Sequence, residues 1–448
     1  MHNRTEQFLN DPVFPLLVRM SAPNTIAFFI QAIVVLAEVW FVSKLGTTSL
    51  AAVALAFPVI MLTQQMAFGA LGGAVTSSIA RSLGAEDKER AEKLLWHSLL
   101  LSCCGYLLFF LIFFIGGESL LMALGGEGSL LEESLLYIKI FLTGAIFIWL
   151  SGMLSAALRG IGNMRFPALL MIVGSGIQVI LAGGLILGWF GLPKLGIIGA
   201  PLSAISVAAL MAIVMILKFM HSSSNVQLKL SNLSFKKELF RDIFNVALPA
   251  SLAPIFTVGT ILILTGLVGQ FGVSALAGYG IGSRIEFLMI PLVFGIGTAM
   301  TTMVGTNIGA KKVERAERIG WLGGSFAGLF SGMIGLMLIL SSSHWINFFA
   351  TDQATYEVTK QYIEIVGLCF TFQGLGLSLY FASQGANAMK WPIIATVIRF
   401  VVAALGGWIA VNWFSSGIAG VFYAAASAMT IYGVMLVLSL KLGAWRSN

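Results

Sequence analysis

Glu38 is a carboxylic acid inside a long apolar stretch, residues 15–42. Placing a charged side chain at the centre of a bilayer costs about 2.5–3.5 kcal/mol on insertion scales, so such a residue needs a partner, a proton or a function. Desolvation disfavours the charged form of a carboxyl group, whereas a nearby organic cation favours it. A proton and a cationic ligand would therefore compete for this carboxylate.

Two interpretations of Glu38 remain open at this point. Because Lys44 follows six positions later, Glu38 could lie at the external end of its span, solvated or paired with this lysine. In the other interpretation it carries a coupling proton, and Pro23, fifteen positions earlier, is the hinge. A proline removes one backbone hydrogen bond and clashes with the preceding turn, so the helix can bend there.

The second half of the chain has its own charged residues within apolar segments. Arg284 and Glu286 are two positions apart and cannot share a helix face, so a structural role between helices and a gating role both remain open. Lys139 and Arg399 are expected to be snorkelling or paired residues.

Enzyme chemistry has little support. The sequence has no Gly-Lys-Ser/Thr phosphate loop, and its four histidines are scattered, unlike the ligands of a metal site. We therefore expect no catalytic residue, no metal and no cofactor.

The elements that position these residues must be membrane-spanning helices. Of the 448 residues, 58% are hydrophobic and 10% are charged, whereas a soluble domain carries about 25% charged residues. A span takes roughly 20 apolar residues. The sequence predicts an all-α membrane protein with twelve spans, at residues 15–42, 49–80, 95–117, 134–158, 166–190, 195–219, 245–270, 275–305, 318–342, 357–384, 391–413 and 417–441.

Charge distribution predicts the orientation of these spans. If the N-terminus is inside, most of the 26 basic residues fall in cytoplasmic segments, and the opposite loop at residues 116–134 has four glutamates and no lysine or arginine. Cationic loops resist translocation, so both termini should be cytoplasmic. This topology explains the net charge of +7 without a nucleic-acid partner.

The chain contains an internal repeat. Residues 84–92 recur at 309–317 with six of nine positions identical, and residues 160–167 align with 385–392 at the same offset of 225. Six spans per repeat predict two parallel six-helix lobes, residues 1–220 and 241–448, joined by a cytoplasmic linker at 221–240 and related by an axis along the membrane normal, with a central cavity. The charged segments 84–92 and 309–317 are interpreted as solvated surface turns, with gating as the alternative.

In these features the sequence resembles the multidrug and toxic compound extrusion (MATE) family, closest to its proton-coupled bacterial branch. The resemblance covers essentially the whole chain. It rests on Pro23 with an acid fifteen positions later and on the ordered motifs Arg81-Ser82-Leu83-Gly84-Ala85, Leu158-Arg159-Gly160-Ile161-Gly162-Asn163, Gly282-Ser283-Arg284-Ile285-Glu286 and Gly305-Thr306-Asn307-Ile308-Gly309-Ala310.

The resemblance also implies site residues. Glu38 takes the place of an aspartate in the first span, Gln31 matches a cavity-facing amide, and Gln178 and Ala182 stand where the fifth span of the proton-linked branch has an asparagine and an aspartate. Gln178 is expected to bond to Glu38. For both Gln31 and Gln178 the alternative is an amide that packs between helices.

In the sodium-linked branch, acids occupy the places of Thr257 and Gln373, so sodium is the less expected coupling ion. Together with Arg284 and Glu286, these two residues are candidates for a cavity in the C-terminal lobe.

The resulting expectation is a monomeric secondary antiporter in the bacterial inner membrane. Its partners would be small molecules and membrane lipids, and it would export cationic or amphipathic compounds in exchange for protons. The alternatives are a flippase for a lipid-linked saccharide, an exporter of one metabolite, a sodium-coupled drug antiporter, and a channel or receptor. Duplicated lobes with a flexible linker argue against a channel or a receptor.

Overall fold

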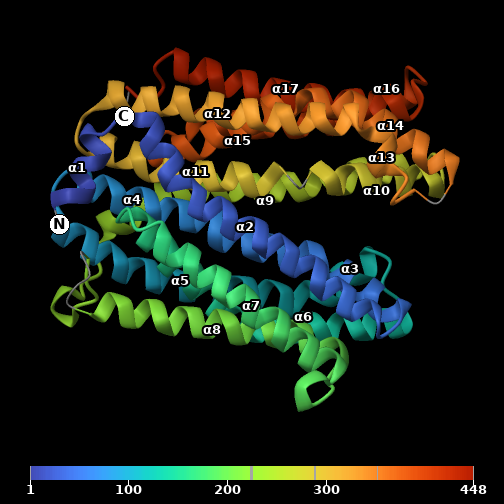
Figure 1. Ribbon diagram of the computed structural model, residues 1–448, viewed down its shortest axis with the longest axis horizontal. Helices are drawn as coiled ribbons and strands as arrows, with labels where there is room; N and C mark the ends of the chain where they lie inside the picture. The colour runs from blue at the N-terminus through green and yellow to red at the C-terminus, as the bar shows by residue number, and fades with distance from the viewer. Residues whose placement is uncertain (1, 222–225, 287–288, 351, 447–448) are drawn as a thin grey trace. The chain divides into compact units, whose positions relative to one another are not determined.

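The computed structural model describes residues 2–221, 226–286, 289–350 and 352–446, which form helices and no strands. Figure 1 shows the course of the chain. The α-helices are α1 (His2–Asn10), α2 (Val13–Ser43), α3 (Thr47–Gln64), α4 (Gly72–Gly84), α5 (Lys88–Ala123), α6 (Gly128–Gly160), α7 (Arg165–Leu187), α8 (Gly199–Met220), α9 (Lys237–Gly269), α10 (Val273–Glu286), α11 (Ile290–Gly309), α12 (Val313–Leu340), α13 (Ser342–Ile346), α14 (Gln353–Val366), α15 (Phe370–Gly385), α16 (Lys390–Asn412) and α17 (Gly417–Lys441).

The twelve predicted spans are confirmed. Among the described residues, twelve helical segments are long and apolar enough to cross a membrane, and each overlaps one predicted span. Lipid offers the backbone no hydrogen-bond partners, whereas a helix satisfies its own backbone hydrogen bonds. Long apolar segments therefore form helices. The second span is built from α3, a π-helical turn at Gln65–Leu71 and α4.

Three span boundaries follow local capping signals. The Asp87 side chain accepts a hydrogen bond from the backbone N–H of Arg90, 2.9 Å away, and so caps the start of α5. Asp352 caps α14 in the same way through Thr355. The left-handed Gly188 ends α7.

The chain forms two compact units whose boundaries fall within helices. Unit 1 contains the residues up to Thr5 and Ile26–Ala247, and unit 2 contains Glu6–Thr25 and Leu248–Asn448. Three helices are therefore divided: α1 passes from unit 1 to unit 2 after Thr5, α2 begins in unit 2, and α9 begins in unit 1. The predicted lobes, residues 1–220 and 241–448, follow the sequence repeat and stay a prediction. Within the predicted linker 221–240, residues 222–225 lie outside the described part of the chain.

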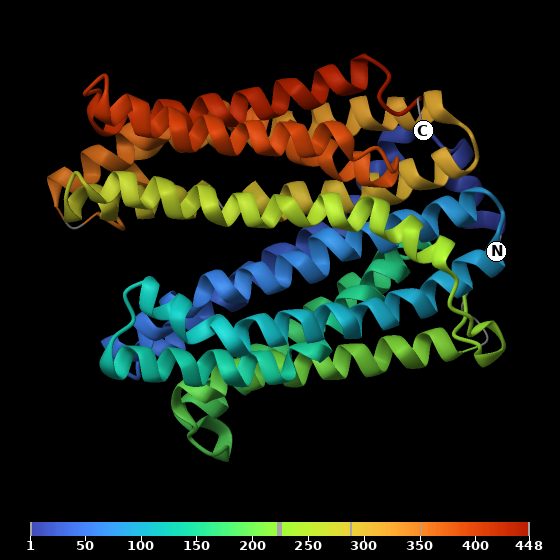
Figure 2. The same cartoon turned by 180° about the vertical axis from the view of Figure 1, so that it is seen from behind.

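Unit 1 is organised around α6. This helix packs against α3, α4, α5 and α8, and α7 packs against α8. Figure 2 shows these blue to green helices running alongside one another. Their apolar core includes Phe41, Leu121, Phe141, Ala182 and Ile186.

Unit 2 is organised around α15, which packs against α11, α12 and α17. The yellow to red helices in Figure 1 belong to this unit. Aromatic side chains form much of its core, and Tyr279, Tyr362 and Phe422 stack or pack edge to face with one another.

The internal repeat extends to backbone geometry. Glu86 and Lys311, at the offset of 225, both adopt left-handed conformations, with φ of 60° and 59°. Thr76 donates a hydrogen bond to the carbonyl of Ala156 at 2.9 Å, and Thr301 repeats this contact with Phe381 at 2.9 Å. Each unit therefore contains the same connection between two of its helices.

Candidate functional site

Among the described residues, the Glu38 carboxylate in unit 1 receives hydrogen bonds from neutral donors only. Gln178 on α7 donates from Nε2 to Glu38 Oε1 at 2.8 Å. The Ser203 hydroxyl on α8 lies 3.4 Å from the same oxygen but is only 2.7 Å from the carbonyl of Ala200. A hydroxyl has one proton to donate, so Gln178 is the main partner of the carboxylate.

Gln31 lies on the same face of α2 as Glu38, because seven residues make about two helical turns. Its Oε1 accepts a hydrogen bond of 3.2 Å from Ser175 on α7. Ser175 and Gln178 are three positions apart and therefore also share a face. The structure thus joins α2 to α7 through two polar pairs, and brings together the predicted residues Glu38, Gln31 and Gln178.

The expected alternative of a salt bridge with Lys44 is not what the structure has. The Lys44 ammonium lies 4.9 Å from the ring centre of Trp40. Among the described residues, no ion pair joins Lys44 to Glu38. Glu38 is also partly buried, so it is not an open surface residue.

Apolar groups surround the rest of this site. Ala182, on α7 one turn beyond Gln178, is fully buried in the core of unit 1. Tyr137 on α6 belongs to the same core and lies within electrostatic range of Glu38. Glu38 is therefore the single acid on this face of α2, with amide and hydroxyl groups nearby.

Pro23 lies inside α2, two residues before the point where the helix passes from unit 2 to unit 1. The neighbouring Asn24 donates to Thr298 on α11 at 3.1 Å. At Gly295 on α11, an added Cβ would come within 2.7 Å of the backbone of Thr25. The start of α2 is thus packed tightly in unit 2 up to the proline.

In unit 2, Thr257 on α9 lies beside a cation. The Arg399 guanidinium on α16 is 3.4 Å from its hydroxyl and 5.2 Å from the ring centre of Tyr432. Gln373 on α15 is buried, and its Oε1 has no hydrogen-bond partner among the described residues.

The other two candidates in unit 2, Arg284 and Glu286, have different surroundings. Glu286 accepts a hydrogen bond of 2.7 Å from the hydroxyl of Tyr362 on α14. Arg284 is exposed. Within the described residues, no hydrogen bond or ion pair joins any two of Thr257, Gln373, Arg284 and Glu286, so the structure does not assemble them into one polar cluster.

Sequence reasoning missed three contributors. Ser175 could have been found from its spacing to Gln178. Ser203 and Tyr137 carry no local signal, because serine and tyrosine are common within membrane helices and only packing brings these two to Glu38.

The family model MatE matches residues 23–182 and 249–409, which is more than half of the chain and one match in each repeat. The chain belongs to the MatE family. It is accordingly a membrane transporter of the MATE type, as its sequence resemblance predicted, and this family is not one of enzymes.

Three relatives illustrate the range of MATE proteins similar to this chain. A probable multidrug resistance protein NorM of Thermotoga maritima is 24% identical, covering 96% of this chain and 93% of the relative. The multidrug export protein MepA of Staphylococcus aureus is 26% identical, covering 95% of each. An FAD transporter of Shewanella oneidensis is 26% identical, covering 90% of each.

Solved MATE structures share the whole fold. A MOP superfamily transporter from Pyrococcus furiosus, described as having a binding pocket of reversed polarity, is 25% identical with a TM-score of 0.92, covering 99% of this chain and 98% of the other. A MATE protein in a straight conformation is 25% identical with a TM-score of 0.91, covering 100% and 99%.

Proposed function

We propose that this transporter is a secondary antiporter that exports cationic or amphipathic organic compounds in exchange for protons by alternating access. The observation that carries the proposal is the environment of Glu38: a membrane carboxyl group bonded by Gln178, with the Ser203 hydroxyl nearby and no cation paired to it among the described residues. The names of the NorM and MepA relatives support drug-like substrates.

Neutral partners suit a group that must bind and release a proton. An ionised Glu38 accepts a hydrogen bond from the amide nitrogen of Gln178, and a protonated Glu38 can donate to the amide oxygen if the amide turns over. A paired arginine or lysine would instead favour the ionised form in both states. The carboxylate is thus able to exchange a proton for a cationic substrate.

The coupling ion is proposed to be the proton rather than sodium. Thr257 and Gln373 offer a hydroxyl and an amide where the sodium-linked branch has acids, and Arg399 lies next to Thr257. A cation beside that position opposes the binding of a second cation. We place the protein in the bacterial inner membrane as a monomer with both termini in the cytoplasm.

The test of this proposal is efflux in everted vesicles. Glu38→Gln resembles the protonated group and should abolish efflux driven by a pH gradient, while Glu38→Asp should keep part of it. Efflux by the unchanged protein should follow the pH gradient and should not require sodium. Full efflux by folded Glu38→Gln, or sodium dependence at constant pH, would contradict the proposal.

A dedicated metabolite exporter is the second candidate, because one relative of similar identity is named an FAD transporter. The two candidate functions are distinguished by giving the same vesicles a panel of cationic dyes and, in parallel, FAD. Export of the dyes alone supports the first candidate, and export of FAD alone supports the second.

A further inference from the structure

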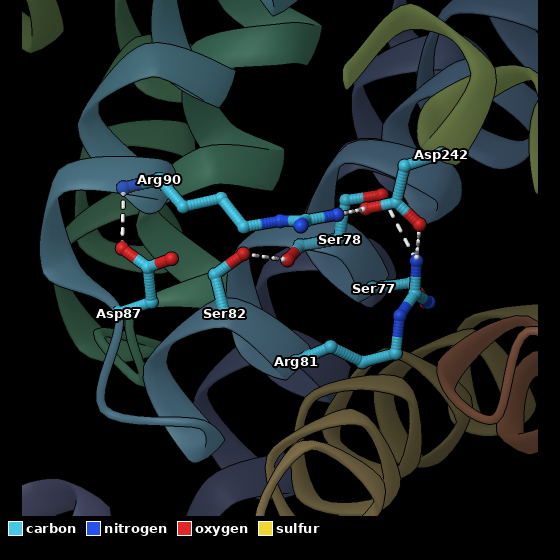
Figure 3. Close-up of polar contacts among 7 residues, drawn as sticks. All are labelled: Ser77, Ser78, Arg81, Ser82, Asp87, Arg90 and Asp242. Atoms are coloured by element: carbon cyan, nitrogen blue, oxygen red, sulfur yellow. Dashed lines mark hydrogen bonds and ion pairs between the residues drawn. The ribbon is translucent and has the colours of Figure 1, made fainter. Parts of the chain in front are cut away.

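Asp242 lies near the start of α9, between two guanidinium groups of unit 1 (Figure 3). Arg81 at the end of α4 contacts its Oδ1 at 2.6 Å, and Arg90 on α5 contacts its Oδ2 at 3.2 Å. Arg81 is itself held by the hydroxyls of Ser77 and Ser78. Each carboxylate oxygen thus has its own charged donor, and charge-assisted hydrogen bonds of this kind are about twice as strong as neutral ones.

The cluster is partly shielded from solvent. The side chain of Asp242 is 15% exposed and that of Arg81 is 13% exposed, whereas that of Arg90 is 42% exposed. The pair with Arg81 should therefore contribute more than the pair with Arg90, because exposed ion pairs are screened by water and salt.

Unit 2 has a corresponding set of contacts, in which the donors hold backbone carbonyls instead of a carboxylate. Arg315, which is 225 positions after Arg90, donates from Nε to the carbonyl of Phe8 at 3.1 Å and also contacts the carbonyl of Asp11. Asn307, which is 225 positions after Ser82, donates to the same carbonyl of Phe8 at 3.1 Å. These donors satisfy carbonyls at the end of α1 and so hold the chain just before α2.

Both held segments lead into helices that change unit. The first turns of α9, up to Ala247, belong to unit 1 and the rest of the helix belongs to unit 2. For α2 the order is reversed, with the change after Thr25. Pro249 and Pro23 lie within two residues of these points. Each helix thus has a firmly held start followed by a residue that weakens its hydrogen-bond ladder.

We propose that Arg81 and Arg90 anchor the start of α9 through Asp242, so that Lys237–Ala247 move as part of unit 1 whenever the transporter changes conformation. Asn307 and Arg315 form the corresponding anchor for residues 8–11 in unit 2. The charged segments 84–92 and 309–317 therefore act in part as binding sites for helix starts, rather than only as solvated turns. Asp242 is thus a positioning residue for transport.

The experiment measures maleimide labelling of a buried cysteine beside each anchor. In a background without Cys103, Cys104 and Cys369, the reporters are Ile243→Cys, where the native side chain is 0% exposed, and Phe8→Cys, where it is 2% exposed. Asp242→Asn should raise the labelling rate of the first reporter about tenfold or more, because two facing arginines would lose their shared anion. The second reporter should not change.

Matched variants sharpen the result. Arg315→Gln should raise labelling at Phe8→Cys and leave Ile243→Cys protected. Arg90→Gln should raise labelling at Ile243→Cys less than Asp242→Asn does, and Asp242→Glu should restore protection in part. Export should fall in the order of these labelling changes.

Two results would overturn the anchor. One is unchanged labelling of Ile243→Cys in Asp242→Asn; the other is an equal rise at both reporters, which would indicate general destabilisation. If Asp242→Asn does not fold, Arg90→Gln decides in its place, with no rise at Ile243→Cys counting against the anchor. Labelling requires neither a substrate nor a coupling ion, so the outcome is independent of the proposed proton exchange.

Discussion

At the scale of single residues, the proposed proton exchange depends on one carboxyl group and its main donor. Gln178 supplies the short hydrogen bond to Glu38, while the Ser203 hydroxyl is closer to a backbone carbonyl. Hydrogen bonds to charged groups contribute about 1.5–3 kcal/mol. The pH range of proton exchange should therefore depend more on Gln178 than on Ser203.

Gln178→Leu removes the donor that stabilises the ionised carboxylate, so Glu38 should hold its proton to a higher pH. We expect the pH of half-maximal efflux to shift upward and the maximal rate to fall about tenfold. A pH profile of dye efflux in everted vesicles measures both. Ser203→Ala is the control and should leave the profile nearly unchanged; equal profiles for all three proteins would exclude Gln178 from the coupling chemistry.

At the scale of elements, the same helix contacts are used twice. Thr76 and Thr301 each bond to a backbone carbonyl of a neighbouring helix, α6 in unit 1 and α15 in unit 2. Both hydroxyls are buried. The repeat thus stabilises each unit by an equivalent connection.

Thr76→Val and Thr301→Val should each lower stability by about 1 kcal/mol, because each removes one buried hydrogen bond and keeps the side-chain shape. The double variant should lose the sum, since distant sites without shared partners are additive. Thermal unfolding in detergent measures these changes. If the stability losses of the two single variants differ severalfold, the contact does not contribute equally to the two units.

Pro23 is the second element-scale feature, because it precedes the point where α2 changes unit. Pro23→Ala restores a backbone donor and removes a residue that costs a helix interior about 3 kcal/mol. We expect the variant to be at least as thermally stable as the parent and to export about tenfold more slowly. Full export by the stable variant would rule out Pro23 as the hinge.

At the scale of the whole molecule, an even number of spans predicts that both ends of the chain lie on one side of the membrane. The basic segments predict that this side is the cytoplasm. Glu127 and Lys311 are exposed residues expected on opposite sides. They are therefore suitable positions for a topology experiment.

In a cysteine-free background, an impermeant maleimide should label Glu127→Cys in intact cells and Lys311→Cys only after the membrane is opened. The reverse labelling pattern would show that the orientation is opposite to the predicted one. Labelling of both in intact cells would contradict the odd number of spans, five, between residues 127 and 311.

The sequence by itself determined the twelve spans and the repeat at 225 residues, and it singled out Glu38 as the candidate for proton coupling. Apolar length fixes a span because an unsatisfied backbone is costly in lipid, and a buried acid stands out against apolar neighbours. The pairing of Gln178 with Glu38 was predicted only through the family resemblance.

Tertiary structure alone decided that Ser203 and Tyr137 approach Glu38, that Lys44 contacts Trp40 instead, and that α2 and α9 each begin in the other unit. These outcomes depend on contacts between helices far apart in sequence, such as the 165 positions between Glu38 and Ser203. In a membrane protein the lipid-facing and core-facing sides of a helix are both apolar, so composition does not show which side meets which neighbour.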